Sequence, residues 1–337
     1  MTLFTLSNSA GMILTGSSVG ASVLGLTVTN AAGVTCDVVL GLPDEAAYRN
    51  NPAYMGCVIG RVAGRTWPTH VNLEGQALEL EINDQHEAHL QGVHLHGGAP
   101  GWHSGDWAIL DQRSDAILLG RASPDGEGGY PGTVHAQVRY QVTSDNRWIV
   151  TFSAVTDRPT PISMTQHAYF NLAGHDASSV ERHALTLPQV RLLPLDLRNV
   201  ADGRELDVEG TPFDFRQAAA IGPRFRAIGG EPPGLDHCFR IGGQPGDLRF
   251  AAGVDCPGAP MRLEVFTTQA ALQVYAGLKL DGSVMGKHGA TYPAYAGLCL
   301  EAQAPPNLLN QPALGSNLLN PGERYSQTTE YRFLERR

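Results

Sequence analysis

The sequence has few basic residues and no long apolar run. Its 337 residues include 24 Lys and Arg against 33 Asp and Glu, which gives a formal charge of −9. Nucleic acids and anionic membrane surfaces are bound through concentrated basic faces, so this balance argues against both partners. No apolar run approaches the length of about 18 residues that spans a bilayer. We therefore expect a polar or neutral small-molecule substrate, no nucleic-acid partner and no membrane partner.

Paired cysteines are also missing. The five cysteines are scattered without a CxxC motif, and their odd number excludes a complete disulfide framework. The first 20 residues contain neither the basic region nor the apolar region of a secretory signal. We expect reduced thiols and an unprocessed, cytoplasmic protein that is a monomer or a homodimer.

Helical periodicity is weak throughout, whereas turn residues are frequent. The 39 Gly and 22 Pro separate short segments that are rich in Val, Leu, Thr and aromatic residues, which is typical of β-proteins. Strands are predicted at residues 34–40, 116–122, 133–142, 148–156, 163–172, 184–187, 190–195, 261–267, 272–276, 297–304 and 328–334. Short helical turns are predicted only at Asp44–Arg49 and Phe215–Ile221.

Residues 133–142 and 148–156 show the clearest alternation of apolar and polar side chains, and the turn Ser144-Asp145-Asn146 separates them. This pattern predicts an antiparallel hairpin with one dry and one wet face. The chain shows no fixed repeat and no composition break. We predict an all-β fold, a large antiparallel β-sandwich with few short helices, that forms a single domain over residues 1–337.

One predicted strand contains an unexpected carboxylate. In the segment 297–304, Leu298, Leu300 and Ala302 point to one face, and Cys299, Glu301 and Gln303 point to the other. Burying an unpaired carboxylate is costly, so Glu301 should meet donors from elsewhere in the chain or bind a ligand. A solvated Glu at the open end of a sheet is the alternative.

Residues 51–65 form an apolar, Gly-rich segment that contains two arginines near its end, Arg61 and Arg65. Arg61 or Arg65 could be a fixed donor to sugar hydroxyls or carboxylates, and a surface charge is an equal alternative for Arg61.

Four histidines, His86, His89, His94 and His96, lie within eleven residues. His94 and His96 should share a face of a strand, while His86 and His89 are expected in a loop. A metal-binding barrel of the cupin kind would place a carboxylate shortly after His-x-His, but Gly97 and Gly98 follow here. We therefore predict no metal site.

The segment 161–172 places Thr165, His167, Tyr169 and Asn171 on one face of a strand. A histidine can exchange a proton near neutral pH, which makes His167 a candidate acid or base, although a buried structural histidine is the alternative. Asp236 beside His237 follows a Pro-rich turn and is a weaker signal.

Taken together, these segments resemble the aldose 1-epimerases, or galactose mutarotases. The matching motifs occur in the family's order: Gly60-Arg61-x-Ala63-x-Arg65, Leu95-His96-Gly97-Gly98, Gly129-Tyr130-Pro131-Gly132, Thr165-x-His167-x-Tyr169-Phe170-Asn171-Leu172, Leu235-Asp236-x-x-Phe239, Leu272-Gln273-x-Tyr275-x-Gly277, Leu300-Glu301-x-Gln303 and Tyr331-Arg332-Phe333. The resemblance covers nearly the whole chain.

The resemblance implies a β-sandwich enzyme that interconverts the α and β anomers of free aldoses, such as galactose and glucose, without cofactor or metal. It assigns Glu301 as general base and His167 as general acid. The sugar would be held by Arg65, His96, Tyr169, Asp236 and Gln303. We expect the attraction between Glu301 and His167 to keep the carboxylate ionised and the imidazole protonated.

Two positions depart from the family pattern: Gly64 stands where Asn is common, and Asn307 where Asp is common. The sequence leaves two other functions open. One is a mutarotase-like sugar-binding or regulatory domain without turnover. The other is an epimerase of a phosphorylated hexose, which would need extra cations at the cleft.

Overall fold

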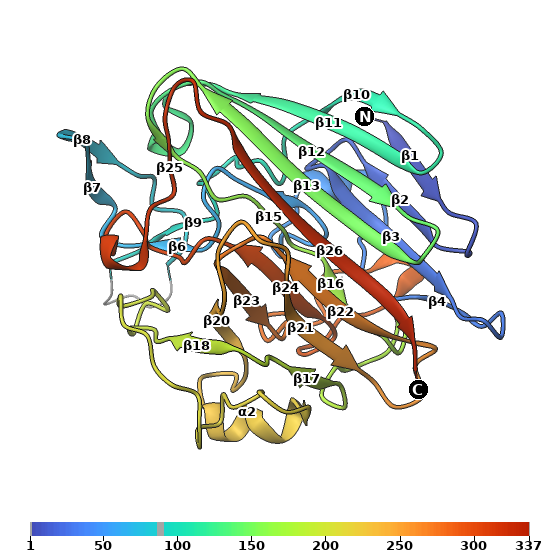
Figure 1. The fold of residues 1–337 in the computed structure, drawn as a ribbon. Coiled ribbons are helices and arrows are strands. Elements are labelled where there is room, and N and C mark those ends of the chain that lie inside the picture. Colours follow the sequence, from blue (N-terminus) through green and yellow to red (C-terminus); the bar gives the residue numbers. More distant parts are fainter. Residues whose placement is uncertain (1, 86–90, 337) are drawn as a thin grey trace.

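The computed structural model describes residues 2–85 and 91–336, and its strands form two packed layers (Figure 1). The first layer is a nine-stranded sheet in the order β10-β11-β12-β13-β26-β22-β21-β17-β19. Its strands are β10 (Ala108–Gln112), β11 (Ala116–Ser123), β12 (Val134–Val142), β13 (Arg147–Thr156), β17 (Ala184–Thr186), β19 (Ala219–Ala220), β21 (Arg249–Asp255), β22 (Met261–Thr267) and β26 (Tyr325–Glu335).

The second layer is made of two smaller sheets. One has the order β1-β2-β3-β4, with β1 (Leu3–Ser7), β2 (Ile13–Ser17), β3 (Ser22–Thr29) and β4 (Thr35–Asp37). The other has the order β16-β24-β23-β20-β18, with β16 (Tyr169–Phe170), β18 (Val190–Leu193), β20 (Asp236–Ile241), β23 (Ala271–Tyr275) and β24 (Leu298–Gln303). This five-stranded sheet holds four of the seven residues predicted for catalysis or sugar binding.

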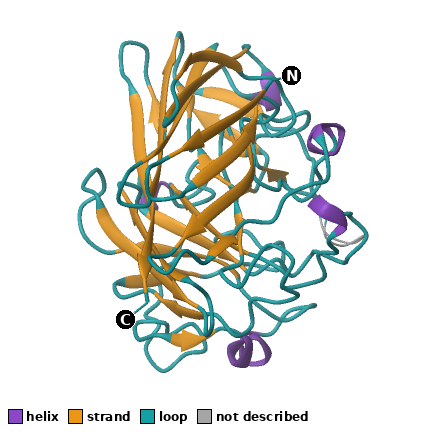
Figure 2. Cartoon of the chain, turned by 90° about the vertical axis from the view of Figure 1, so that its right-hand side faces the viewer, coloured by secondary structure: helices purple, strands orange, loops and turns teal. Residues whose placement is uncertain are grey.

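Short pairs of strands and a few helical turns complete the described part of the chain. The pairs are β14 (Thr160–Pro161) with β25 (Leu318–Leu319), β15 (Thr165–Gln166) with β5 (Val58–Ile59), β6 (Arg65–Thr66) with β9 (His94–Leu95), and β7 (His70–Leu73) with β8 (Gln76–Glu79). The helices are α1 (Glu45–Arg49) and α2 (Gly222–Ile228), with 3-10 turns at Glu127–Gly129, Lys287–Gly289 and Pro312–Leu314. The helices lie at the periphery (Figure 2). Among the described residues, no helix is long and apolar enough to cross a membrane.

Aromatic side chains hold the layers together. Trp148 of β13 stacks on Tyr331 of β26 with ring centroids 4.8 Å apart, and Phe170 of β16 lies 5.1 Å from Tyr331. The Tyr331 hydroxyl donates to the Leu300 carbonyl of β24 at 3.2 Å. Burying such large rings is a major source of core stability. The predicted antiparallel sandwich is therefore confirmed.

The hairpin and the first helical turn agree with the sequence. β12 and β13 pair antiparallel, with Val142 opposite Trp148 at the turn. Asp44 caps α1 by accepting a hydrogen bond from the Ala47 amide at 3.0 Å, as expected of an N-cap carboxylate.

The second predicted helix was wrong. Instead of a helix over Phe215–Ile221, the chain makes a β-strand at Ala219–Ala220, and the helix runs over Gly222–Ile228. Proline is favoured in the first helical turn, where its missing N–H is not needed. Pro223 occupies that place, so it begins the helix after the segment that we predicted.

The predicted strand 163–172 is divided. β15 pairs with β5, whereas β16 pairs with β24, and His167 lies in the step between them. The apolar set is correct, because Met164, Ala168, Phe170 and Leu172 all pack in the core. Asn171 was predicted on the same face as His167, but its amide instead donates to the carbonyls of Ala177 and Ala296 and supports the loops.

Candidate active site

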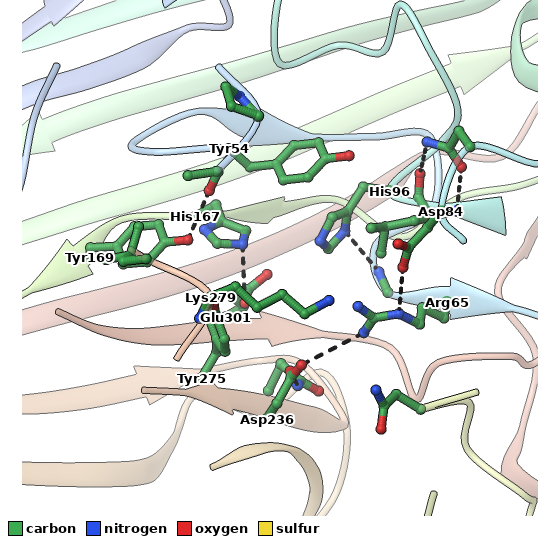
Figure 3. A pocket seen from close by; sticks show the side chains of 18 of the residues that line it. Tyr54, Arg65, Asp84, His96, His167, Tyr169, Asp236, Tyr275, Lys279 and Glu301 are labelled. Atoms are coloured by element: carbon green, nitrogen blue, oxygen red, sulfur yellow. Dashed lines mark hydrogen bonds and ion pairs between the residues drawn. The ribbon is translucent and has the colours of Figure 1, made fainter. Parts of the chain in front are cut away.

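A cavity of about 530 Å³ opens over the face of the five-stranded sheet. Side chains from β6, β20, β23 and β24 and from several loops line it. All seven residues predicted for catalysis or sugar binding are among them: Arg65, His96, His167, Tyr169, Asp236, Glu301 and Gln303. Figure 3 shows six of these by label, directed toward one space.

Strand β24 supplies the cavity floor. Its alternation is as predicted, because Leu298, Leu300 and Ala302 belong to the core while Glu301 and Gln303 face the cavity. The Glu301 Oε2 atom and both polar atoms of the Gln303 amide are buried and find no hydrogen-bond partner within the described protein. Buried polar atoms without partners are rare and costly. Their position in the cavity marks them as groups that a polar ligand would satisfy.

His167 lies beside Glu301, with 3.7 Å between Nε2 and the carboxylate Oε1. Both side chains are buried, at 5% and 2% exposure. Burial raises the pKa of Glu301 well above its ordinary range, with a further rise from Asp236. Burial lowers the pKa of His167 to about 4. Both directions favour the neutral pair, against our expectation that attraction keeps both groups charged, because burial is the largest cause of each shift.

The other nitrogen of His167 contacts Cys299. The Sγ atom lies 3.6 Å from Nδ1, and burial followed by the nearby Glu301 raises the pKa of the Cys299 thiol. The Nδ1–H of a neutral imidazole can donate to Sγ, which leaves Nε2 as the acceptor that faces the protonated Glu301. Tyr169 packs against the same ring at 5.1 Å, and its hydroxyl donates to the Ala53 carbonyl at 2.8 Å. These contacts fix the orientation of His167.

His96 reaches the cavity through a change in backbone direction. The residue follows β9 with a φ of +53°, so the chain turns between His94 and His96. The Gly64 amide donates to His96 Nδ1 at 3.1 Å, and the proton of the neutral ring therefore lies on Nε2. Burial and then the nearby His167 and Arg65 keep its pKa well below the ordinary value.

The prediction that His94 shares this face was wrong. His94 is fully buried, with Nε2 at 2.8 Å from the Tyr130 hydroxyl and Nδ1 at 2.6 Å from the Glu81 carbonyl. The left-handed backbone at His96 separates the two rings, because alternation across a strand holds only while the strand continues. His86 and His89 lie outside the described residues.

Arg65 stands between two carboxylates. Its Nε donates to Asp84 at 3.0 Å, and its Nη1 lies 3.8 Å from Asp236 (Figure 3). Asp236 also accepts from the Gln273 amide at 2.7 Å. This network holds the guanidinium in a fixed position at the cavity wall, where its remaining N–H groups can meet a polar ligand.

Arg61 has a different role. It is 1% exposed, and its guanidinium donates to the Ser123 hydroxyl and to the carbonyls of Ser123, Pro124 and Pro131. Neither reading of Arg61 as a surface charge or a ligand donor is correct. The side chain ties the loop after β11 to the strands beneath it.

Sequence reasoning missed three charged residues of the cavity, Asp84, Lys279 and Asp281. Asp84 comes from the segment before the histidines and reaches Arg65 from the opposite side to Asp236. Lys279 follows β23 in a loop that also contributes residues 280–284 to the lining. No alternation pattern marks a loop residue, but the motif Leu272-Gln273-x-Tyr275-x-Gly277 ends only two positions before Lys279.

Three residues of the same cavity carry side chains of the kinds that bind metal ions, namely two histidines and a glutamate. In the part of the chain that the structure describes, one atom each from His96, His167 and Glu301 lie within 4.8 Å of one another. These are not the four sequence-adjacent histidines considered above. Because Nε2 of His167 and the Glu301 carboxylate already face each other, the geometry equally suits a pair that exchanges protons, and no metal is needed to explain it.

Comparison with known proteins agrees with this geometry. A model of the family described as aldose 1-epimerase matches residues 2–332. The chain belongs to the aldose 1-epimerase family. The epimerase is 36% identical to the galactose mutarotase of Bos taurus over 316 residues, covering 93% of this chain and 89% of the relative. It is 34% identical to the aldose 1-epimerase of Escherichia coli K12, covering 98% and 95%.

Solved structures give the same result for the fold. A galactose 1-epimerase from Lactobacillus acidophilus superposes on the epimerase with a TM-score of 0.82 and 28% identity, covering 99% of this chain and 94% of that one. An aldose epimerase homologue from C. elegans gives a TM-score of 0.90, with 24% identity and coverage of 100% and 99%. The predicted family, the isomerase class and the mutarotase function are confirmed, and the non-catalytic and phosphohexose alternatives are not favoured.

Proposed function

We propose that the epimerase interconverts the α and β anomers of free aldohexoses such as galactose and glucose, with Glu301 as general base and His167 as general acid. The supporting observation is the buried contact of 3.7 Å between these two groups at the floor of the cavity. A base and an acid that lie 3.7 Å apart can act on the C1 hydroxyl and the ring oxygen of one sugar, since these two oxygens share a carbon.

The reaction conserves atoms and protons. Glu301 takes the proton of the C1 hydroxyl, C1 becomes an aldehyde carbon as the bond from C1 to the ring oxygen breaks, and His167 gives its proton to that oxygen. Rotation about the C1–C2 bond presents the other face of the aldehyde. The reverse proton transfers then close the ring as the other anomer.

The neutral form of the pair is compatible with these roles. A neutral Glu301 and a neutral His167 together carry one proton, which is also the number on an ionised Glu301 and a protonated His167. Transfer of that proton across the 3.7 Å contact produces the reactive form without exchange with solvent. Sugar hydroxyls that donate to the Glu301 carboxylate would favour the charged form, because hydrogen bonds to a charged group lower its cost.

The remaining predicted residues would hold the sugar. Arg65 and His96 offer N–H donors at one wall, Asp236 offers a carboxylate acceptor, and Gln303 offers both kinds of group beside Glu301. Tyr169 contributes an apolar ring face, because its hydroxyl is already engaged with Ala53. Donors near the ring oxygen would also stabilise the charge that develops there.

The decisive variant is Glu301→Gln, which keeps the shape of the side chain and removes the base. We expect catalysed anomerisation to fall by about 10²–10⁴-fold, the usual contribution of general acid–base catalysis. Polarimetry on freshly dissolved α-galactose or α-glucose measures the rate, and calorimetric titration measures sugar binding. Retained binding with lost turnover is the expected result.

The matched control is Arg113→Met, which changes an arginine side chain that is 69% exposed and lies outside the cavity. It should turn over sugar at the wild-type rate. A near wild-type rate for Glu301→Gln would refute the assignment of the base. Exchange rates measured across glucose, galactose, xylose and arabinose would rank the substrates.

The oligomeric state and the location stay predictions. We propose that the protein is a monomer or a homodimer. We also propose a location in the cytoplasm, which is supported by the reduced cysteines expected from the sequence. Light scattering on the purified protein and fractionation of cells would test the two statements separately.

A further inference from the structure

The mechanism gives no role to Lys279, although this side chain lines the cavity. Lysine is rare in the chain: the 24 basic residues include only Lys279 and Lys287. Lys287 is buried and forms an ion pair with Asp37 at 2.6 Å. Lys279 is therefore the chain's one lysine with access to a ligand.

The backbone holds Lys279 in place at the cavity. Its amide donates to the hydroxyl of Tyr275, itself a cavity residue, at 3.0 Å. In Figure 3 the side chain extends across the cavity from the side of Tyr275, with its amine directed toward Arg65 and His96. The loop thus presents a primary amine to any ligand that lies over Glu301.

The cavity also holds carboxylates, but none of those described forms a direct ion pair with the Lys279 amine. The two carboxylates nearest to Arg65 are Asp84 at 3.0 Å and Asp236 at 3.8 Å, so the charge of Arg65 is already balanced. Among the described residues, no carboxylate lies within the 4.0 Å ion-pair distance of the Lys279 amine. Burial and then Arg65 lower the pKa of Lys279, while Asp84 and Asp236 oppose that shift from further away. An incoming anion would therefore stabilise this cation.

We propose that Lys279 binds the carboxylate of hexuronates, so that the epimerase also interconverts the anomers of aldoses oxidised at C6. This inference rests on the proposed function of Glu301 and His167. The C6 group takes no part in ring opening, so a carboxylate there leaves the chemistry unchanged. One cation without a direct ion pair among the described residues suits one negative charge, whereas a phosphate dianion calls for several donors, and Asp281 in the same lining would repel a second charge.

The test compares galacturonate with galactose at pH 7, where the uronate is ionised. NMR exchange spectroscopy gives kcat/KM for both sugars after subtraction of the spontaneous rate. We expect the wild-type enzyme to accelerate both, and Lys279→Met to lower kcat/KM for galacturonate about tenfold more than for galactose, the scale of one charge-assisted hydrogen bond. Lys279→Arg, which keeps the charge, should retain most of the galacturonate rate.

Arg113→Met again serves as the control, since it removes one positive charge from the surface, and it should leave the ratio of the two rates unchanged. Equal losses on both sugars in Lys279→Met would overturn the inference. So would a larger dependence on Lys279 for galactose 6-phosphate than for galacturonate. An enzyme that is active on galactose but inert on galacturonate overturns this inference alone, whereas inactivity on both sugars overturns the proposed function as well.

Discussion

Glu301 and His167 meet where water is nearly excluded, and this fact governs their protonation more than their proximity does. Their separation of 3.7 Å is short enough for attraction, but each group has lost almost all of its hydration. Desolvation disfavours the charged form of both groups, so it raises the pKa of the acid and lowers that of the imidazole. The burial of these two side chains therefore determines which protonation states they adopt, and a sequence motif alone does not show that burial.

In the proposed mechanism the pair of Glu301 and His167 carries a single titratable proton, and this sets the expected dependence of activity on pH. The pKa of His167 is lowered to about 4, so a second proton binds only below that pH and then removes the base. The pKa of Glu301 is raised, so the last proton leaves only at high pH and then removes the acid. We expect kcat/KM to stay level from about pH 5 to above neutrality, with its acid limb near pH 4.

Stopped-flow polarimetry, corrected for spontaneous mutarotation at each pH, would measure this profile. An acid limb between about pH 6 and 7, where an unperturbed histidine titrates, would contradict it.

Seven residues of the cavity lining were predictable from the sequence, but their partners were not. Alternation along one strand placed Glu301 and Gln303 on the face away from the core. The other five predicted residues came from the family motifs that occur in order along the chain: Arg65, His96, His167, Tyr169 and Asp236. Asp84 was not predicted because its role comes from a contact with Arg65 of β6, which lies in another part of the chain. His94 was misplaced because the left-handed backbone of His96 interrupts the strand, and no side-chain pattern announces that turn.

At the scale of elements, strand β24 separates two tasks. One set of alternate residues packs in the core, and the other set forms the floor of the cavity. A strand makes this separation easily, since successive side chains point to opposite faces. The strand boundaries of β22 and β24 were predictable for the same reason, whereas the step at His167 depends on pairing with β5 and β24, which are distant in sequence.

Arg61 offers a test of how the cavity wall is supported. Arg61→Met would leave the carbonyls of Ser123, Pro124 and Pro131 without their donor in a buried place. We expect a loss of about 3 kcal/mol in the free energy of unfolding, because buried acceptors keep their desolvation cost when the donor is removed. Urea denaturation followed by fluorescence would measure it.

The exposed Arg113→Met provides the comparison, with an expected change within about 0.5 kcal/mol. Equal stabilities of the two variants would show that the Arg61 contacts do not support the fold.

For the whole molecule, the core joins the ends of the chain. One continuous cluster of buried side chains runs from Phe4 in β1 to Phe333 in β26, and it includes residues from both layers. This continuity supports the prediction, made from the lack of a repeat or composition break, of a single domain over residues 1–337, because parts that share one core unfold together.

Scanning calorimetry tests that prediction directly. We expect one thermal transition whose calorimetric and van't Hoff enthalpies agree. Two separable transitions, or a van't Hoff enthalpy well below the calorimetric one, would indicate independent units.

The scarcity of lysine determines how the protein can be attached to a surface. Besides the α-amino group, only Lys279 and Lys287 carry primary amines, and the Lys287 side chain is 9% exposed and paired with Asp37. An amine-reactive resin would therefore immobilise many molecules with the mouth of the cavity against the support. A sugar that covers Lys279 during coupling would direct attachment to the α-amino group and leave the immobilised catalyst accessible.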